Sequence, residues 1–159
     1  MRFIIALIAV VCTTSCGSFK NSSNSKTGVV LSMSPIDVLI TEIAISKLNT
    51  ESKHDLITFN NTGNHYVIIY KVSDEIIAYP IIGRAWVGGP VCRIEIPERT
   101  FNYSQDLINT VIWHELGHCY RMEHEGTRDD IMYYAASPLS YYSQEAKERF
   151  FGRLYEATH

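Results

Sequence analysis

The stretch from His114 to His124, which reads HELGHCYRMEH, constrains the fold of this chain more than any other. On a helix, His114 and His118 lie about 40° apart around the axis and about 6 Å apart along it, so both rings can reach one metal ion. Glu115 lies one step further around, where it is poorly placed as a ligand but can reach a water molecule on that ion. The stretch therefore predicts a helix that carries a metal site.

The position of His124 adds a requirement on the backbone. It follows His118 by six residues, about 240° around a continuous helix, so its ring would point away from the ion. The helix must therefore end after about residue 120, and the chain must turn back. Arg121 lies where this turn is needed, and a residue with a Cβ atom in a left-handed turn costs on the order of 1 kcal/mol. We expect Arg121 in a strained or rearranged conformation that ends the helix.

Residues 1–16 have the features of an export signal. A positive charge at Arg2 precedes an unbroken apolar run from Phe3 to Val11. This run is shorter than the roughly twenty residues that cross a bilayer as a helix. Residues 15–18, SCGS, resemble the end of a bacterial lipoprotein signal. We therefore expect lipidation of Cys16, and the alternative is an ordinary signal peptide that is cut a few residues later.

The rest of the chain is expected to form one folded domain. Residues 17–27 are rich in serine, asparagine and lysine and are typical of a flexible polar tether. Residues 28–159 suffice for a single domain. The net charge of -3 without long charged runs gives no electrostatic case for binding nucleic acid. We expect an exported monomer of the cell envelope, either lipid-anchored, in the outer membrane or facing the periplasm, or secreted.

Export also changes the expectation for Cys92 and Cys119. Outside the cytoplasm these two cysteines form an even pair that is free to oxidise. A disulfide across a loop of this length would stabilise the fold by roughly 3.5 kcal/mol in the chain-entropy model. We favour a disulfide over two free thiols, although the spacing alone does not place the two side chains together.

Apolar periodicity predicts an α+β fold. The predicted helices span residues 35–49, 104–121 and 143–157. The predicted strands span residues 28–32, 55–59, 65–72, 81–87 and 91–96. The first helix is expected to pack on the core through its apolar residues, which are Ile36, Leu39, Ile40, Ile43 and Leu48. The last helix is expected to be amphipathic, with the inward residues Phe150, Phe151 and Leu154.

At this point the residues resemble a known group of enzymes. His114-Glu115-Leu116-Gly117-His118 with His124 resembles the long zinc motif of the metzincin metallopeptidases. Met132 resembles the methionine of their Met-turn, which lies beneath the metal. The resemblance covers residues 28–159 in the order of elements and not in identity. It implies a zincin-like α+β fold, in which a twisted mixed sheet with an antiparallel edge strand accompanies an N-terminal helix, an active-site helix and a C-terminal helix.

The resemblance also implies a role for each matching residue. His114, His118 and His124 would bind one Zn²⁺ ion per chain, and Glu115 would be the base that deprotonates a zinc-bound water. That water would attack a peptide carbonyl, so the chain would be a zinc-dependent endopeptidase that hydrolyses peptide bonds.

Two further features follow from the resemblance. Tyr134 resembles a tyrosine of the astacin and serralysin branches that binds zinc or steadies the oxyanion, whereas Tyr133 resembles the tyrosine of the matrixin branch. The branch therefore stays open. The edge strand would be Gly83-Arg84-Ala85-Trp86-Val87, and a peptide or protein substrate would bind to it by strand addition.

Two alternative interpretations stay open. A thermolysin-like (gluzincin-type) metallopeptidase would use His114 and His118 with a third ligand from the last helix, Glu145 or Glu148. A surface lipoprotein could instead bind zinc without cleaving anything and act as an interaction module. Glu115 argues against this second alternative, because a purely structural zinc site has no use for a base.

Overall fold

The computed structural model describes residues 28–59 and 66–159. The predicted signal of residues 1–16, with its lipidation site at Cys16, and the predicted tether of residues 17–27 lie outside the described residues. Within the described ranges the chain forms one five-stranded sheet and three α-helices, α1 (Pro35–Ser52), α2 (Gln105–Cys119) and α3 (Gln144–Thr158). None of these helices is both long and apolar enough to cross a membrane.

The sheet is mixed, and its antiparallel strand lies at an edge. The strand order is β2-β1-β3-β5-β4. Four strands run parallel, and they are β1 (Gly28–Ser32), β2 (Thr58–Phe59), β3 (Val67–Val72) and β5 (Cys92–Pro97). The fifth, β4 (Arg84–Trp86), pairs antiparallel with β5, so that Arg84 lies opposite Glu95. The mixed α+β fold expected from the periodicity is confirmed.

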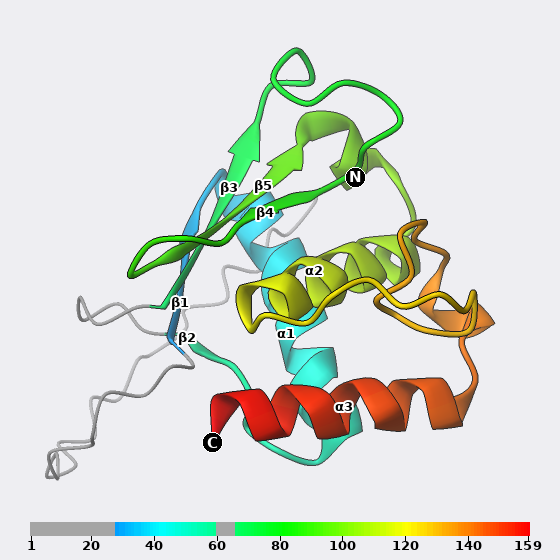
Figure 1. Cartoon of the computed structure of the whole chain (residues 1–159). Helices are drawn as coiled ribbons and strands as arrows, with labels where there is room; N and C mark the ends of the chain where they lie inside the picture. The colour runs from blue at the N-terminus through cyan, green and yellow to red at the C-terminus, as the bar shows by residue number, and fades with distance from the viewer. Residues whose placement is uncertain (1–27, 60–65) are drawn as a thin grey trace, which may run out of the picture.

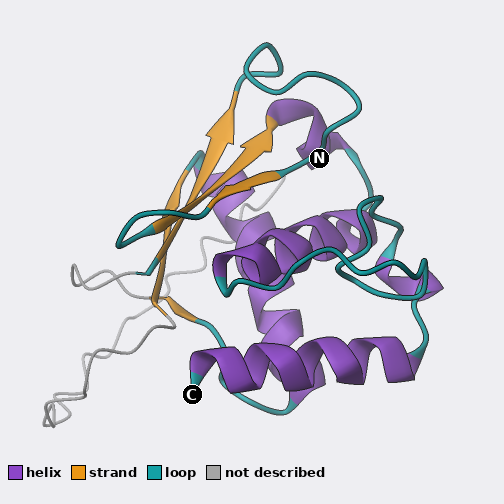
Figure 2. Cartoon of the chain, viewed as in Figure 1, coloured by secondary structure: helices purple, strands orange, loops and turns teal. Residues whose placement is uncertain are grey.

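The helices lie together on one side of the sheet (Figure 1). Figure 2 shows α2 beside the strands, α1 behind it and α3 farthest from the sheet. The alternation in β5 explains this layering, because Cys92, Ile94 and Ile96 are buried while Arg93 points to solvent. A sheet that is apolar on one face is stable only when that face is covered.

A serine begins each of the three helices. The hydroxyl groups of Ser34, Ser104 and Ser143 accept the backbone N–H of the third following residue, at 3.5, 3.4 and 3.1 Å. These bonds satisfy donors that have no partner within the helix. The start of each helix is therefore set by a local signal in the sequence.

Trp113 sets the position of α2 between the other two helices. Its ring is fully buried, and its Nε1–H donates to the carbonyl oxygen of Ala44 on α1 at 2.8 Å. The same ring lies parallel to Phe150 and meets the edge of Phe151, both on α3. The residue before His114 thus joins all three helices, so α2 is held from both sides.

The predicted inward face of α1 is wrong in part. Ile36, Leu39 and Ile43 are 68%, 56% and 45% exposed, although the helix itself was expected. The buried face carries smaller side chains as well as large ones, and its members include Thr41, Ala44, Ile45 and Leu48. The Nε1–H of Trp113 donates to the backbone oxygen of Ala44, so the face of α1 that meets α2 is the one that contains Ala44.

Two predicted strands are shorter than expected. Regular pairing in the segment 81–87 covers only β4, because side chains and not a neighbouring strand bind the preceding carbonyl groups. Arg99 donates to the oxygen of Ile81 at 2.6 Å, and Thr100 donates to that of Ile82 at 2.7 Å. The segment 55–59 likewise pairs only at Thr58–Phe59. Residue 65 of the predicted strand 65–72 lies outside the described residues.

A disulfide joins the sheet to the end of α2. Cys92 at the start of β5 is bonded to Cys119, the last residue of α2, and their Cα atoms are 5.5 Å apart. Of the two alternatives left by the sequence, the structure shows the disulfide.

Replacing Cys92 and Cys119 together with alanine should lower the free energy of unfolding by about 3.5 kcal/mol, because the unfolded chain regains the freedom that the closed loop removes. Urea unfolding of the oxidised protein and of the variant measures the difference. The wild-type protein unfolded under a thiol reductant provides the matched comparison. An unchanged midpoint in the variant would contradict the expectation.

Candidate metal centre

The end of α2 turns the chain as the third histidine requires. The N–H of Arg121 donates to the oxygen of His118 at 2.9 Å, and the N–H of Met122 donates to that of Gly117 at 3.0 Å. This pair of bonds is a Schellman motif, whose left-handed residue is usually glycine. Here that residue is Arg121, with a φ of 63°. The expectation that the helix ends in a strained turn at Arg121 is confirmed, although α2 already stops at Cys119.

Contacts from the sheet hold this helix end in place. The hydroxyl group of Tyr66 donates to the oxygen of Cys119 at 3.0 Å. Its ring lies against the ring of Tyr120, with centroids 5.3 Å apart. Together with the bond between Cys92 and Cys119, these contacts fix the point from which the chain turns back.

The turn brings the three predicted ligands together. The Nε2 atoms of His114, His118 and His124 form a nearly equilateral triangle, with sides of 3.1, 3.1 and 3.2 Å. In the described part of the chain these three residues are the only group of histidine, cysteine and acidic side chains that could hold a metal ion together. His114 is buried, His118 is half-buried and His124 is exposed, so one side of the triangle faces solvent.

Backbone carbonyl groups decide which ring nitrogens carry protons. Nδ1 of His114 lies 2.7 Å from the oxygen of Ile131, and Nδ1 of His118 lies 2.9 Å from that of Met122. A carbonyl oxygen only accepts, so both Nδ1 atoms must donate and both Nε2 atoms carry a lone pair. Burial also lowers the pKa of His114 to about 4 and that of His118 below its usual value. Both rings are therefore neutral at pH 7, which is the form that binds a metal.

The histidine triangle fits a zinc ion. Zinc binds imidazole nitrogen at about 2.0–2.1 Å in tetrahedral geometry, which places two ligand atoms about 3.3 Å apart. The observed separations of 3.1 to 3.2 Å are close to that value. Lone pairs that face one another at this distance repel unless a cation lies between them. The donor set therefore matches a metal ion compatible with zinc.

Glu115 lies between α2 and the edge strand. It is buried, and the same cavity of about 570 Å³ is lined by Glu115 and by all three histidines. Burial raises the pKa of Glu115 to about 8, and a hydrogen bond from the backbone of Ala85 acts against this shift. Gly83 packs closely against Glu115. A Cβ atom on residue 83 would lie 2.9 Å from Oε1 of Glu115, so this packing depends on a glycine.

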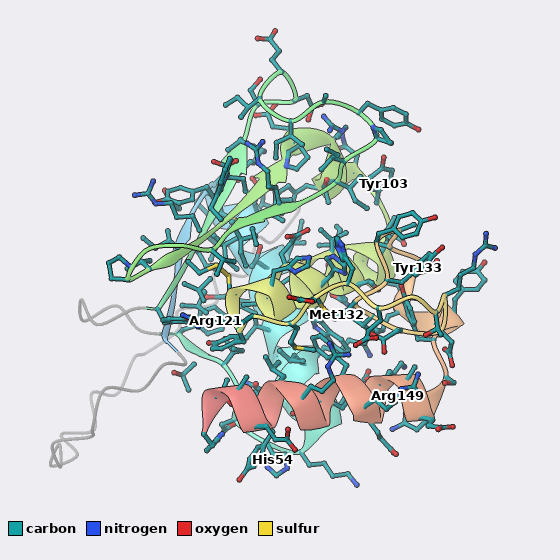
Figure 3. All side chains as sticks on the ribbon, viewed as in Figure 1. His54, Tyr103, Arg121, Met132, Tyr133 and Arg149 are labelled. Carbon is teal, nitrogen blue, oxygen red and sulfur yellow. A yellow bond between two sulfur atoms is a disulfide. The ribbon has the colours of Figure 1, made fainter. Side chains whose placement is uncertain are left out.

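Met132 packs directly beneath the helix that carries two of the ligands (Figure 3). A Cβ atom on Gly117 would lie 2.4 Å from the sulfur of Met132, so only glycine leaves room for it. The N–H of Glu125 donates to the oxygen of Met132 at 3.0 Å. This bond ties the residue after His124 to the segment beneath the helix, and so helps to place the third ligand.

Asp130 anchors the segment that contains Met132. Its Oδ1 accepts the N–H of Met132 at 2.8 Å, and its Oδ2 lies 3.9 and 3.8 Å from nitrogen atoms of Arg149 and Arg153 on α3. Because Asp130 is buried, these contacts are screened less than surface ion pairs. The last helix thus holds this segment, and Arg153 also pairs with Glu125, the residue after His124, at 2.9 Å.

The cavity distinguishes between the two tyrosines. Tyr134 is among its lining residues and is 70% exposed, whereas Tyr133 is not among them. The two rings lie against each other, with centroids 4.3 Å apart. The backbone around Gly83, Arg84 and Ala85 forms the opposite wall, so the edge strand and Tyr134 flank the histidines.

The alternative ligands are not part of the centre. Glu145 is an exposed residue that pairs with Arg149 on its own helix at 3.5 Å. Glu148 accepts a hydrogen bond from Gln144 at 3.0 Å. Neither belongs to the group that could hold a metal in the described part of the chain. This arrangement does not support a third ligand from α3.

Several supporting residues were not found from the sequence. The carbonyl groups of Met122 and Ile131 orient two of the histidines. Every residue has a backbone oxygen, so the residue type does not predict this role. Tyr66 is distant in sequence and gave no signal. Asp130 could have been found, because an aspartate that binds the N–H two residues later is a common turn signal.

Comparisons with known proteins do not place this chain in a family. No family model matches it, and no match is found among the curated proteins.

Replacing Gly117 with alanine should lower the free energy of unfolding by about 1–3 kcal/mol, because the new methyl group overlaps Met132 in a filled core. Gly152→Ala on α3 is the matched control. No atom lies within 4 Å of a Cβ atom there, so the same change should raise stability by about 0.5–1 kcal/mol. Thermal and urea unfolding of both variants would check the pair, and two effects of equal sign would contradict it.

Zinc should bind at about one ion per chain and raise the melting temperature of metal-free protein by about 10 °C at a hundredfold excess over Kd. His118→Ala should lose most of this shift, because one of three ligands is gone. His54→Ala is the control, since His54 packs on Tyr155 at the far side of α3 (Figure 3). Elemental analysis and thermal unfolding measure both quantities. Equal shifts in the two variants would argue against the histidine triangle as the site.

Proposed function

We propose that this chain is an exported zinc-dependent endopeptidase with a zincin-like domain of the metzincin kind. The observation that carries the proposal is the convergence of three imidazole nitrogen atoms and one buried carboxyl group on a single cavity beside a sheet edge. A purely structural zinc site closes all four positions with protein ligands. Here the described residues supply three ligands and leave one side open, which is typical of catalytic sites.

Zinc held by the three histidines would polarise a substrate carbonyl group and make a bound water more acidic. Glu115 is the residue that would take the proton from the attacking water, because its carboxyl group lines the same cavity as the ligands. Burial raises the pKa of Glu115, and a cation held by the three histidines would act against this shift and favour the charged, basic form. The N–H of Ala85 holds the carboxyl group in place, so the base is oriented by the strand that would bind substrate.

The edge strand supplies the binding surface for a peptide. β4 pairs with β5 along one side only, and its other side borders the cavity that the histidines line. An extended peptide that adds to this side as a further strand is held by main-chain hydrogen bonds, whatever its side chains are. Its backbone then passes the histidines within reach of Glu115 and Tyr134. This arrangement favours peptides or unfolded protein as substrates.

The proposal includes export of the protein from the cytoplasm. The apolar run before Cys16 supports export, and a lipid on Cys16 would anchor the domain to the cell envelope through the polar residues 17–27. The disulfide between Cys92 and Cys119 is consistent with an oxidising compartment. The alternative of a zinc-binding module without activity makes no use of the buried Glu115.

Replacing Glu115 with glutamine should lower the cleavage rate of an unfolded protein at least a hundredfold, because the base is lost while the shape stays the same. The variant should still bind about one zinc per chain. Glu148→Gln is the control and should change neither zinc content nor cleavage, since this residue lies on α3 away from the centre. Proteolysis of a labelled unfolded protein, with elemental analysis, measures both. Equal cleavage by wild type and Glu115→Gln would reject the peptidase proposal.

A further inference from the structure

A second groove continues the cavity past the histidines. Its volume is about 890 Å³, and it shares Ala85, His118 and His124 with the first cavity. One wall is the end of β4 with the glycine-rich loop that follows, and the other is the chain that leaves α2. The remaining lining residues are Tyr66, Trp86, Val87, Gly88, Gly89, Arg121, Met122 and Glu123. A peptide laid along β4 would pass from one hollow into the other.

Arg121 stands out among the residues of this groove. Its side chain is exposed, and within the described residues its guanidinium group makes no hydrogen bond or ion pair. Its backbone is left-handed, which a glycine would adopt without strain. Lys53 is left-handed as well, so this conformation alone points to no function. What distinguishes Arg121 is an unpaired cation placed where a bound peptide would lie.

The neighbouring charges differ from Arg121 in their partners. Arg84 is neutralised by Glu95 at 2.6 Å and stacks over Trp86 at 4.5 Å from the ring centroid. Arg84 therefore has little capacity left for a ligand. Glu123 is the one carboxylate among the described residues that line the groove. Arg93 is not among the lining residues of this groove and lines a different hollow together with Glu95.

The direction of strand addition decides which part of a peptide meets Arg121. Antiparallel pairing is slightly more stable per residue than parallel pairing. β4 runs from Arg84 to Trp86, so an antiparallel peptide enters at Trp86 and leaves at Arg84. Residues N-terminal to the scissile bond then lie in the second groove. A planar guanidinium group binds a carboxylate through two parallel hydrogen bonds, which a neutral side chain cannot match.

We propose that Arg121 is a specificity-determining residue that selects peptides with an acidic side chain on the N-terminal side of the scissile bond. This inference rests on the proposed peptidase function.

The test measures binding without cleavage. Zinc-loaded Glu115→Gln protein is titrated with labelled decapeptides that are acetylated and amidated, neutral apart from one glutamate, and scanned through all positions. Each has a counterpart with glutamine, and fluorescence anisotropy gives the two Kd values. The best glutamate peptide should bind about tenfold more tightly than its counterpart. Adding Arg121→Gly should bring this ratio close to one, while zinc content stays at about one per chain.

Three further variants separate charge from backbone conformation. Lys53→Gly makes the same backbone change at the end of α1 and should leave the ratio unchanged. Arg121→Lys keeps the charge without the planar fork and should leave a smaller preference. Glu123→Gln removes the opposing charge and should raise the preference. A merely structural Arg121 would make Arg121→Gly and Lys53→Gly alike, with changed stability and an unchanged ratio.

The results that test the role of Arg121 differ from the results that test the peptidase function. Equal binding of glutamate and glutamine peptides, or no binding of any peptide, overturns the role of Arg121. So does a preference that survives Arg121→Gly. Cleavage of unfolded protein by the wild type is scored separately, so a peptidase without acidic selectivity would leave the proposed function standing. A glutamate preference that depends on Arg121 supports the inference even if wild type cleaves none of the peptides.

Discussion

Three imidazole nitrogen atoms that face one another are the constraint on which the candidate centre depends. At 3.1 to 3.2 Å, with their outer nitrogens bound to carbonyl groups, His114 and His118 cannot turn away to reach other partners. Their arrangement is unfavourable without a cation and favourable with one. The polar groups around them keep the rings from relaxing, so the site is organised before any ion binds.

α2 contributes large side chains to the core and also carries two of the three histidines. Trp113 and Leu116 are fully buried in the core, while His118, two residues after Leu116, is half-buried and lines the open cavity. A core position makes the helix rigid, and rigidity is what a metal site needs from its ligands. The helix must nonetheless stop abruptly so that His124 can return. Three features stabilise the end of α2 at Cys119 and Tyr120: the Schellman turn, the disulfide and the hydrogen bond from Tyr66.

The elements with local signals could be predicted from the sequence. β1 has the predicted bounds, and the serine that precedes each helix marks its start. It was harder to predict which face of a helix is buried and which element covers it. The apolar spacing of Ile36, Leu39 and Ile43 is helical, yet these side chains are exposed, because α2 packs on the face of α1 that contains Ala44. Periodicity shows that a helix has an apolar stripe, but the neighbouring element decides which stripe is buried.

The sequence by itself determined the chemistry of the candidate centre: three histidines, one glutamate, and a helix that has to end near Arg121. Those conclusions depend on spacing along one continuous segment, and helical geometry is the same in every protein. Tertiary structure alone decided how the rings are held and what surrounds them. The carbonyl groups of Ile131 and Met122, the anchoring of Asp130 by α3 and the second groove beside Trp86 come from segments brought together by packing. Such contacts depend on the shape of the whole domain, which local sequence does not encode.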